Sequence, residues 1–333
     1  MKTVSINVMN LCVPCENRCR YCLLSYDGNT TGIAFARSKK YAKSFYDWLK
    51  VNRPELSFLF GFGYSMEHPE LIDAIRFCQS IGSATGEFLQ FDGMKFRDAR
   101  ELEVLLSELK TNGIKLIDLT FYGTEAYHDR FAARTGDYRL MMRTLDVANR
   151  TNLDVTVSIP LLHENADQMD ALLKELDKYR TVKISCFVPH AEGRGHLLEK
   201  ARFTLEDYEK LSERVKGLFN RERFKTEGEW TLAGDIPQNE RRVLTVTLTP
   251  DNIEFFENLS FADTIAYLEE LDDTYYRTVP EFSELLRLYG DPEGTKMYSA
   301  RDLYLCYQRR YIAENGIDVY DVNDERQCFS RRI

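Results

Sequence analysis

Short apolar runs alternate with amphipathic stretches along the first 200 residues of the chain. Apolar runs bounded by turn residues predict strands, and they fall at 4–8, 57–62, 87–91, 116–121, 154–159 and 182–188. Apolar residues that recur every three or four positions predict helices over 39–51, 69–81, 98–111, 138–151 and 166–179. Strands and helices that alternate in this way are typical of the α/β class with a parallel sheet.

The number of these units limits the kind of barrel that they can build. Six βα units are too few for a complete eight-stranded barrel. They favour a partial (β/α)6 barrel of parallel strands over residues 1–200, with right-handed connections. Functional side chains in such barrels lie in the loops that follow the strands. Residues directly after a predicted strand are therefore the first candidates for a site.

The pattern changes after residue 200. A charged helix is expected over 204–223, with Thr204 as its N-cap and Asp207 three residues later. A strand is then expected at 242–249, followed by helices at 261–272, 279–289 and 300–314. Residues 201–333 are therefore expected to form a smaller, mostly helical C-terminal extension. We expect it to act as a lid or a substrate-docking module on the barrel.

Composition and charge limit the class of partner. The chain has 333 residues, of which 53 are acidic and 44 basic, for a net charge of −9. Nucleic-acid binders usually show a basic excess, so no nucleic-acid partner is expected. The first ten residues lack the apolar run of a secretory signal. No stretch approaches the roughly 20 apolar residues that span a bilayer, so we expect a cytoplasmic protein without a membrane partner.

Four of the eight cysteines crowd into one short segment, Cys12-Val-Pro-Cys15-Glu-Asn-Arg-Cys19-Arg-Tyr-Cys22, directly after the first strand. In a chain without a secretory signal, such crowding indicates metal binding before disulfides. Two pairs, Cys12 with Cys15 and Cys19 with Cys22, offer four thiolates to zinc, although only three residues separate the pairs. Cys15, Cys19 and Cys22 alone offer three thiolates, which leave one iron of a [4Fe–4S] cluster open. We favour the cluster and keep a zinc-binding or electron-transfer protein as the alternative.

The spacing Cys15-x3-Cys19-x2-Cys22, with Tyr21 before the last cysteine, resembles the signature of the radical S-adenosylmethionine (SAM) enzymes. The resemblance implies that these three cysteines ligate a [4Fe–4S] cluster and that Tyr21 lies near the adenine of SAM. In that family the open iron chelates SAM, and reduction of the cluster cleaves SAM to methionine and a 5′-deoxyadenosyl radical, which abstracts hydrogen from the substrate. An external one-electron reductant such as flavodoxin or ferredoxin is implied as a partner.

The segment after the second strand, Phe60-Gly61-Phe62-Gly63-Tyr64, is similar to the Gly-Gly-Glu-Pro segment of the family. The resemblance implies that the main chain of Gly61 and Gly63 contacts the amino group of SAM, because glycine lets a backbone approach closely. Tyr64 stands where the family usually has Glu. It is a low-ranked catalytic candidate at the end of a strand.

Later segments are similar to the branch that contains sulfatase- and peptide-modifying members. Thr120-Phe121-Tyr122-Gly123 precedes His128-Asp129 and Arg134, and Val188 is followed by Gly193-Arg194-Gly195. The resemblance implies that Thr120 contacts SAM, that Arg134 binds its carboxylate, and that the backbone near Val188 supports the adenine. Tyr122 replaces the Asp of that branch. The Cys-rich domain that such relatives use for auxiliary clusters is not expected here.

The substrate is expected to be a small molecule or a peptide. Candidates to contact it follow the strands and are Tyr64, Asp92, Tyr122, Glu125 and His163. Cys186 lies inside the sixth strand and alternates with Ser185 and Phe187. If it faces the interior of the barrel, it can return a hydrogen atom to a substrate radical, as epimerases require. If it faces outward, it is a small buried hydrophobic residue.

Overall fold

The computed structural model describes residues 3–10, 15–25, 32–62, 66–83, 86–234, 241–324 and 327–328. The strands are β1 (Thr3–Asn10), β2 (Ser57–Phe62), β3 (Phe88–Gln90), β4 (Leu116–Thr120), β5 (Asp154–Pro160), β6 (Lys183–Phe187), β7 (Phe224–Thr226), β8 (Arg241–Leu248) and β9 (Met297–Ser299). The predicted strands therefore all form, and each lies within about two residues of its predicted bounds.

The α-helices are α1 (Phe35–Asn52), α2 (Leu71–Ser80), α3 (Ala99–Thr111), α4 (Glu125–Ala132), α5 (Asp137–Arg150), α6 (Met169–Leu176), α7 (Leu205–Lys210), α8 (Glu213–Lys216), α9 (Glu227–Ala233), α10 (Ile253–Asn258), α11 (Phe261–Thr278), α12 (Phe282–Tyr289) and α13 (Ala300–Asn315). In the described ranges, 3-10 helices also lie at Ala166–Gln168 and Gly193–Ala201. The α/β class with a helical C-terminal extension is confirmed.

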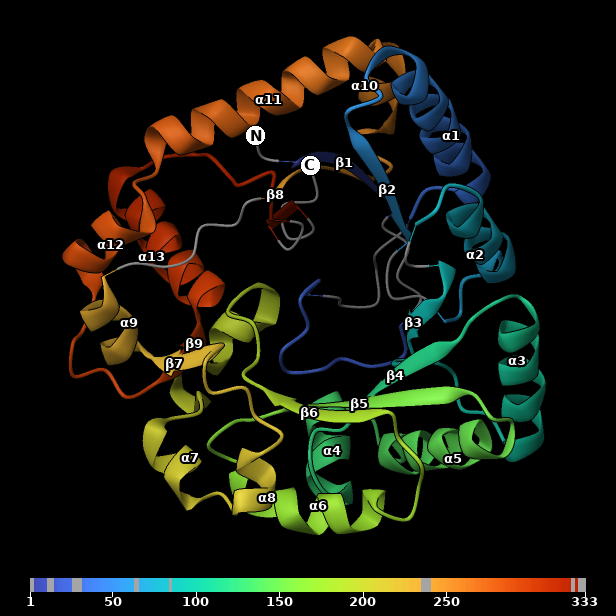
Figure 1. The fold of residues 1–333 in the computed structure, drawn as a ribbon, viewed down its shortest axis with the longest axis vertical. Coiled ribbons are helices and arrows are strands. Elements are labelled where there is room, and N and C mark those ends of the chain that lie inside the picture. Colours follow the sequence, from blue (N-terminus) through green and yellow to red (C-terminus); the bar gives the residue numbers. More distant parts are fainter. Residues whose placement is uncertain are drawn as a thin grey trace.

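The strands line the inside of a ring, and the helices cover its outside (Figure 1). Six parallel strands come from the first 200 residues, as predicted, and they belong to two sheets. One sheet has the order β2-β1-β8 and the other β3-β4-β5-β6, with parallel pairing throughout. The carboxyl ends of parallel neighbours meet at the same edge, so the loops that follow them can build one site.

Strand β8 departs from the sequence-based division of the chain. It comes from the segment expected to form a helical extension, yet it pairs along its whole length with β1, from Thr3–Arg241 to Asn10–Leu248. The physical reason lies in shared burial. Ile6 of β1 and Leu244 of β8 belong to one core cluster, which is also packed by Leu268 of α11. The extension therefore adds a strand to the barrel-like ring as well as helices, and its role as a docking module stays a prediction.

The two faces of the second sheet differ in polarity. Val155, Val157 and Ile159 alternate along β5 and pack in the core cluster beneath the outer helices. Thr156 and Ser158 point to the other face, where both donate hydrogen bonds to Asp118 of β4, at 2.7 and 3.0 Å. Side chains in a strand alternate between faces, so the face directed to the inside of the ring carries polar groups.

The expected helix over 204–223 divides into two short helices. Thr204 and Asp207 form the predicted capping box at the start of α7. Leu211 then leaves the helical conformation, with φ −65° and ψ 147°, and its side chain packs in the core. Ser212 caps α8 through a hydrogen bond from the N–H of Val215. Burial of one leucine therefore outweighs the helical periodicity of the segment.

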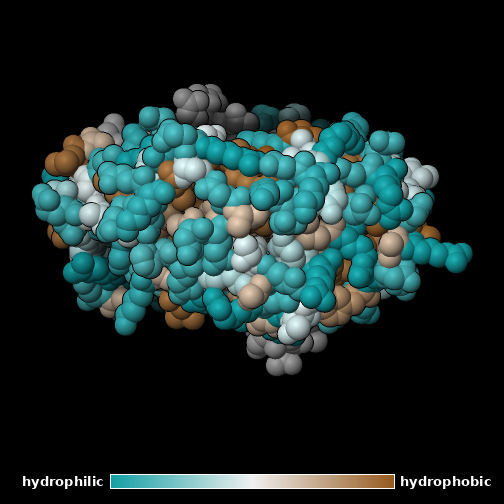
Figure 2. Space-filling model, turned by 90° about the horizontal axis from the view of Figure 1, so that it is seen from below, coloured by the Kyte–Doolittle hydropathy of each residue, from teal (hydrophilic) through white to brown (hydrophobic). Residues whose placement is uncertain are grey.

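Hydrophilic residues predominate on the face seen in Figure 2, and hydrophobic residues are scattered singly among them. Scattered apolar residues are normal on a protein surface. No helix in the described part of the chain is long and apolar enough to cross a bilayer.

Candidate active site

The segment 15–25, which carries the three predicted ligands, lies inside the ring of strands (Figure 1). Main-chain hydrogen bonds join it to segments that follow three different strands. They are Glu16 N–H to Gly93 O at 2.8 Å after β3, Arg18 N–H to Ala132 O at 2.9 Å and Arg20 N–H to Phe131 O at 3.0 Å after β4, and Arg194 N–H to Cys22 O at 2.9 Å after β6. We call residues 15–25 the cysteine loop. It is held from several sides at the edge where barrel enzymes place their chemistry.

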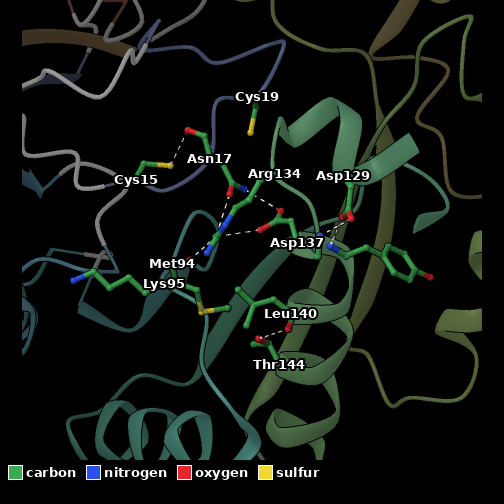
Figure 3. Close-up of polar contacts among 12 residues, drawn as sticks. Cys15, Asn17, Cys19, Met94, Lys95, Asp129, Arg134, Asp137, Leu140 and Thr144 are labelled. Carbon is green, nitrogen blue, oxygen red and sulfur yellow. Dashed lines mark hydrogen bonds and ion pairs between the residues drawn. The ribbon is translucent and has the colours of Figure 1, made fainter. Parts of the chain in front are cut away.

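A buried polar network ties the cysteine loop to the start of α5 (Figure 3). Asn17 donates to Asp137 Oδ2 at 3.0 Å, and Arg134 Nη1 donates to Asn17 Oδ1 and to Asp137 Oδ1, both at 3.3 Å. Arg134 Nη1 also donates to the carbonyl of Met94 at 2.5 Å. Asn17 and Asp137 are both almost completely buried. Buried polar groups need such partners, so the network fixes the middle of the loop.

His128 and Asp129, which lie in α4 after strand β4, have structural roles around the same network. The N–H of Tyr122 donates to His128 Nδ1 at 3.2 Å, which places the imidazole proton on Nε2, 3.1 Å from Asp137 Oδ2. The carboxylate of Asp129 accepts from the N–H groups of Gly136 and Tyr138 at the start of α5, at 2.5 and 2.9 Å. The predicted role of Arg134 as a ligand of the SAM carboxylate stays a prediction, since its guanidinium already shares Asp137.

Cys19 faces an aromatic wall. Its Sγ lies 3.1 Å from the hydroxyl of Tyr122, whose side chain is buried. The ring of Tyr21 packs edge-on against Tyr122, with centroids 5.7 Å apart, and in a tilted arrangement against Phe131, with centroids 5.6 Å apart. Burial, with the neighbouring Cys19, raises the pKa of Tyr122, so the hydroxyl stays protonated and available as a donor to sulfur. Tyr122, a candidate for contact with the substrate, lies beside a predicted metal ligand, and its contact with a substrate stays a prediction.

Cys15 packs against Gly93, and any other residue at position 93 would displace the Cys15 side chain. Gly93 has φ +69°, and a Cβ built on it would overlap the Sγ of Cys15. The same Gly93 accepts the hydrogen bond from Glu16. A left-handed φ strains residues that carry a Cβ. The turn Asp92-Gly93 after β3 therefore forms a cradle for the first predicted ligand.

The three thiols form a donor set that suits an iron–sulfur cluster. Burial raises the pKa of Cys15 to about 11 and that of Cys19 still further, and the charges of the other cysteines in the loop add to both shifts. Thiolate is the ligating form, and a bound metal stabilises it. In the described residues no three His, Cys, Asp or Glu side chains converge on a single metal ion; in a cluster each cysteine binds a different iron.

Thr120 lies on the inner face of the sheet, beside Asp92. Its N–H and its hydroxyl donate to the two oxygens of the Asp92 carboxyl, at 3.0 and 2.8 Å. Burial raises the pKa of Asp92 to about 7, and the charge of Asp118 acts in the same direction, while the bonds from Thr120 lower it. Thr120 therefore occupies the predicted place at the end of β4, and its contact with SAM stays a prediction.

Cys186 requires a correction. In the parallel register Cys186 pairs with Ile159, so both point to the face that packs in the main core cluster. Burial raises the pKa of its thiol to about 12. Ser185, which pairs with Ser158, lies on the inner face instead. The predicted hydrogen-atom donor needs the inner face, so the structure leaves Cys186 as a buried hydrophobic residue.

The remaining predicted residues divide into three groups. Val188 is buried in the main core cluster, and nothing here tests its backbone contact with adenine. Gly61 packs against Met9 of β1, at a point where a Cβ would overlap the methionine sulfur. Cys12, Gly63 and Tyr64 lie outside the described residues. Sequence analysis missed Asn17 and Gly93, although their positions beside the cysteines and after β3 could have indicated them.

A family model described as the radical SAM superfamily matches residues 9–176. A comparison with curated protein sequences found no match. Coproporphyrinogen III oxidase from Escherichia coli has 11% identity and a TM-score of 0.44, over 93% of this chain and 91% of the other. Streptococcus suis SuiB bound to precursor peptide SuiA has 11% identity and a TM-score of 0.48, over 77% of this chain and 61% of the other. Native anSMEcpe with bound AdoMet and Kp18Cys peptide has 12% identity and a TM-score of 0.45, over 94% and 97%.

Proposed function

The chain belongs to the radical SAM superfamily, whose members are enzymes that use a [4Fe–4S] cluster and SAM, and we propose that Cys15, Cys19 and Cys22 hold that cluster here. One observation carries the proposal. The loop with the three thiols is hydrogen-bonded to Gly93, Ala132 and Arg194, in segments that follow three strands. Three thiolates leave one iron free for SAM. When bound, these groups supply the one-electron chemistry that removes a hydrogen atom from a substrate.

The protein's own residues would hold, orient and shield this centre. Asn17 and Arg134 anchor the loop through Asp137. Tyr122, which is buried, and Tyr21, which is half-buried and packs edge-on against it, would cover one side of the centre with aromatic surface. Such a cover would help to exclude water from the place where a reactive species forms. Thr120 and the main chain near Val188 and Gly61 are proposed as contacts of SAM.

The substrate that we propose is a small molecule or a peptide, and the electron would come from an external reductant such as flavodoxin or ferredoxin. Hydrogen abstraction would lead to dehydrogenation, rearrangement, epimerisation or cross-linking. The polar inner face around Asp118 and Thr120 supports a substrate with hydrogen-bonding groups, because buried polar side chains favour partners of their own kind.

Replacing Cys15, Cys19 and Cys22 together with Ala is expected to abolish iron binding and SAM cleavage, because no thiolate of the loop remains. The measurement is iron and sulfide per chain after anaerobic reconstitution, with 5′-deoxyadenosine formed from SAM and dithionite. Cys306→Ala, outside the loop, is the matched control and should keep both.

Cys12→Ala separates the two kinds of metal site. A cluster on the other three cysteines should keep its iron in this variant, whereas a four-cysteine zinc site should lose its metal. A wild-type protein that carries zinc and forms no 5′-deoxyadenosine would contradict the proposal.

A further inference from the structure

Arg194 follows β6 and is fixed to the cysteine loop by its main chain. Its N–H donates to the carbonyl of Cys22 at 2.9 Å. The preceding residue, Gly193, has φ +56° and packs directly on the carbonyls of Cys22 and Leu23, where a Cβ would overlap both. Main-chain contacts therefore fix the position of Arg194, and its side chain is not needed to hold the segment on the loop.

The guanidinium of Arg194 has one buried edge without an acceptor. Its Nε and Nη2 are inaccessible to solvent and find no hydrogen-bond partner in the described part of the chain. These two nitrogens form the edge that binds both oxygens of a carboxylate at once. Two other arginines use this edge. Arg37 binds Glu257 through Nε at 3.0 Å and Nη2 at 2.5 Å, and Arg301 binds Asp324 at 3.2 and 2.5 Å.

The acids around this segment already have other partners. Glu192 accepts from Arg309 of α13 at 2.8 Å. Asp302 of α13 accepts from the N–H of Ala191 at 3.1 Å and from Ser299. Glu199 binds Lys296 at 2.8 Å and Arg202 at 3.0 Å. These acids lie on the segment of Arg194 and on α13, whose side chains contact that segment, and each already accepts hydrogen bonds from another group.

A buried charge without a partner is unfavourable, since burial removes its hydration and nothing replaces it. Such a group persists where a ligand supplies the missing charge. We propose that Arg194 binds a carboxylate of a molecule held beside the cysteine loop, with both oxygens on its Nε–Nη2 edge. Arg134 differs because it shares Asp137 and so already has an acid.

Two molecules can bring this carboxylate, namely SAM, through its methionyl end, and a substrate with a free carboxylate. Which of them does so rests on the proposed function. The preference of Arg194 for a carboxylate is independent of the proposed function, because it follows from the unpaired Nε–Nη2 edge alone.

The first test measures SAM binding by calorimetry on the reconstituted protein. If SAM supplies the carboxylate, Arg194→Gln should weaken SAM binding by at least about tenfold, which corresponds to losing charge-assisted hydrogen bonds. Its affinity for decarboxylated SAM should stay unchanged. Arg194→Lys keeps the charge without the fork and should recover part of the affinity. Arg37→Gln removes an arginine whose same edge is already bound to Glu257. This control variant should bind both compounds normally.

The second test follows the Nε–H signal of Arg194 by NMR in chain labelled with ¹⁵N-arginine, assigned with Arg194→Gln. Propionate should shift the signal in the metal-free chain, and propionamide should not. If the substrate supplies the carboxylate, propionate should also shift it in SAM-saturated protein, and Arg194→Gln should leave SAM affinity unchanged.

An Arg194 signal that neither propionate nor SAM moves would overturn the proposal. The propionate titration of the metal-free chain tests the carboxylate site independently of the proposed function. A protein that binds no iron but shows the propionate shift would refute the proposed function and leave the carboxylate site standing.

Discussion

Asp137→Ala is expected to lower the free energy of unfolding by about 3–5 kcal/mol, which is the usual cost of removing one partner of a buried ion pair. Asp137 is buried and binds Asn17, His128 and Arg134 together. Its removal leaves the Arg134 charge without its carboxylate, and it takes away the acceptor that Asn17 and His128 share. The measurement is urea unfolding of the metal-free chain, together with iron per chain after reconstitution, which should also fall.

Two further variants make this result decisive. Asp146→Ala, on the same helix α5, removes an exposed pair with Arg150 and should change stability by no more than about 0.5 kcal/mol. Asn17→Ala removes only the link between this network and the cysteine loop. It should fold, with a free energy of unfolding lowered by about 1–3 kcal/mol, and it should bind less iron than the wild type. Equal unfolding midpoints for Asp137→Ala and Asp146→Ala would refute the proposed anchoring.

Gly193→Ala is expected to lower the free energy of unfolding by about 2–4 kcal/mol. The variant places a Cβ on a residue with left-handed φ, and this Cβ overlaps backbone atoms. The added methyl group would meet the carbonyls of Cys22 and Leu23, which cannot turn aside as a side chain can. The turn that carries the last predicted ligand should therefore shift. Iron per chain should fall in parallel with the midpoint of urea unfolding.

Gly316→Ala separates the two contributions. Gly316 has φ +63°, close to the +56° of Gly193, but a Cβ there meets no atom of the described residues within 4 Å. Gly316→Ala should lower the free energy of unfolding by only about 1–2 kcal/mol and leave iron binding intact. The difference between the two variants reports the contact with Cys22. If both lose stability equally and both keep their iron, the packing of Gly193 on the loop has no role in the site.

Much of the fold could be predicted because local patterns determine it. The strands β2, β4 and β5 are apolar runs with turn residues at their ends, and they form where such runs occur. Helix α4 was missed, since Glu125–Ala132 is only eight residues long. That length is shorter than the window of 11–18 residues in which helical periodicity becomes visible.

The pairing of β8 with β1 could not be predicted, because it depends on contacts between residues some 238 positions apart, such as Thr3 and Arg241. The alternation of β8 indicated a strand but not its neighbour. The same limit applies to Cys186, whose orientation depends on the register of β6 against β5.

The site shows the same division. The spacing of the three cysteines was enough to propose them as metal ligands, which stays a prediction. The lack of a partner for the Arg194 edge instead depends on contacts between residues distant in sequence. Glu192 is two residues away, and only the folded chain brings Arg309 against it. Sequence shows which residues carry charge, but their pairing is a property of the tertiary structure.

The pairing of β1 with β8 also has a consequence for biosynthesis. Until the ribosome has released residues 241–248, β1 is paired on one side at most, and its other edge is open to wrong partners. The strand that leads into the cysteine loop is thus made well before the strand that encloses its second edge. A cluster assembled before residues 241–248 are made would meet an incomplete scaffold, in which one edge of β1 lacks its partner strand.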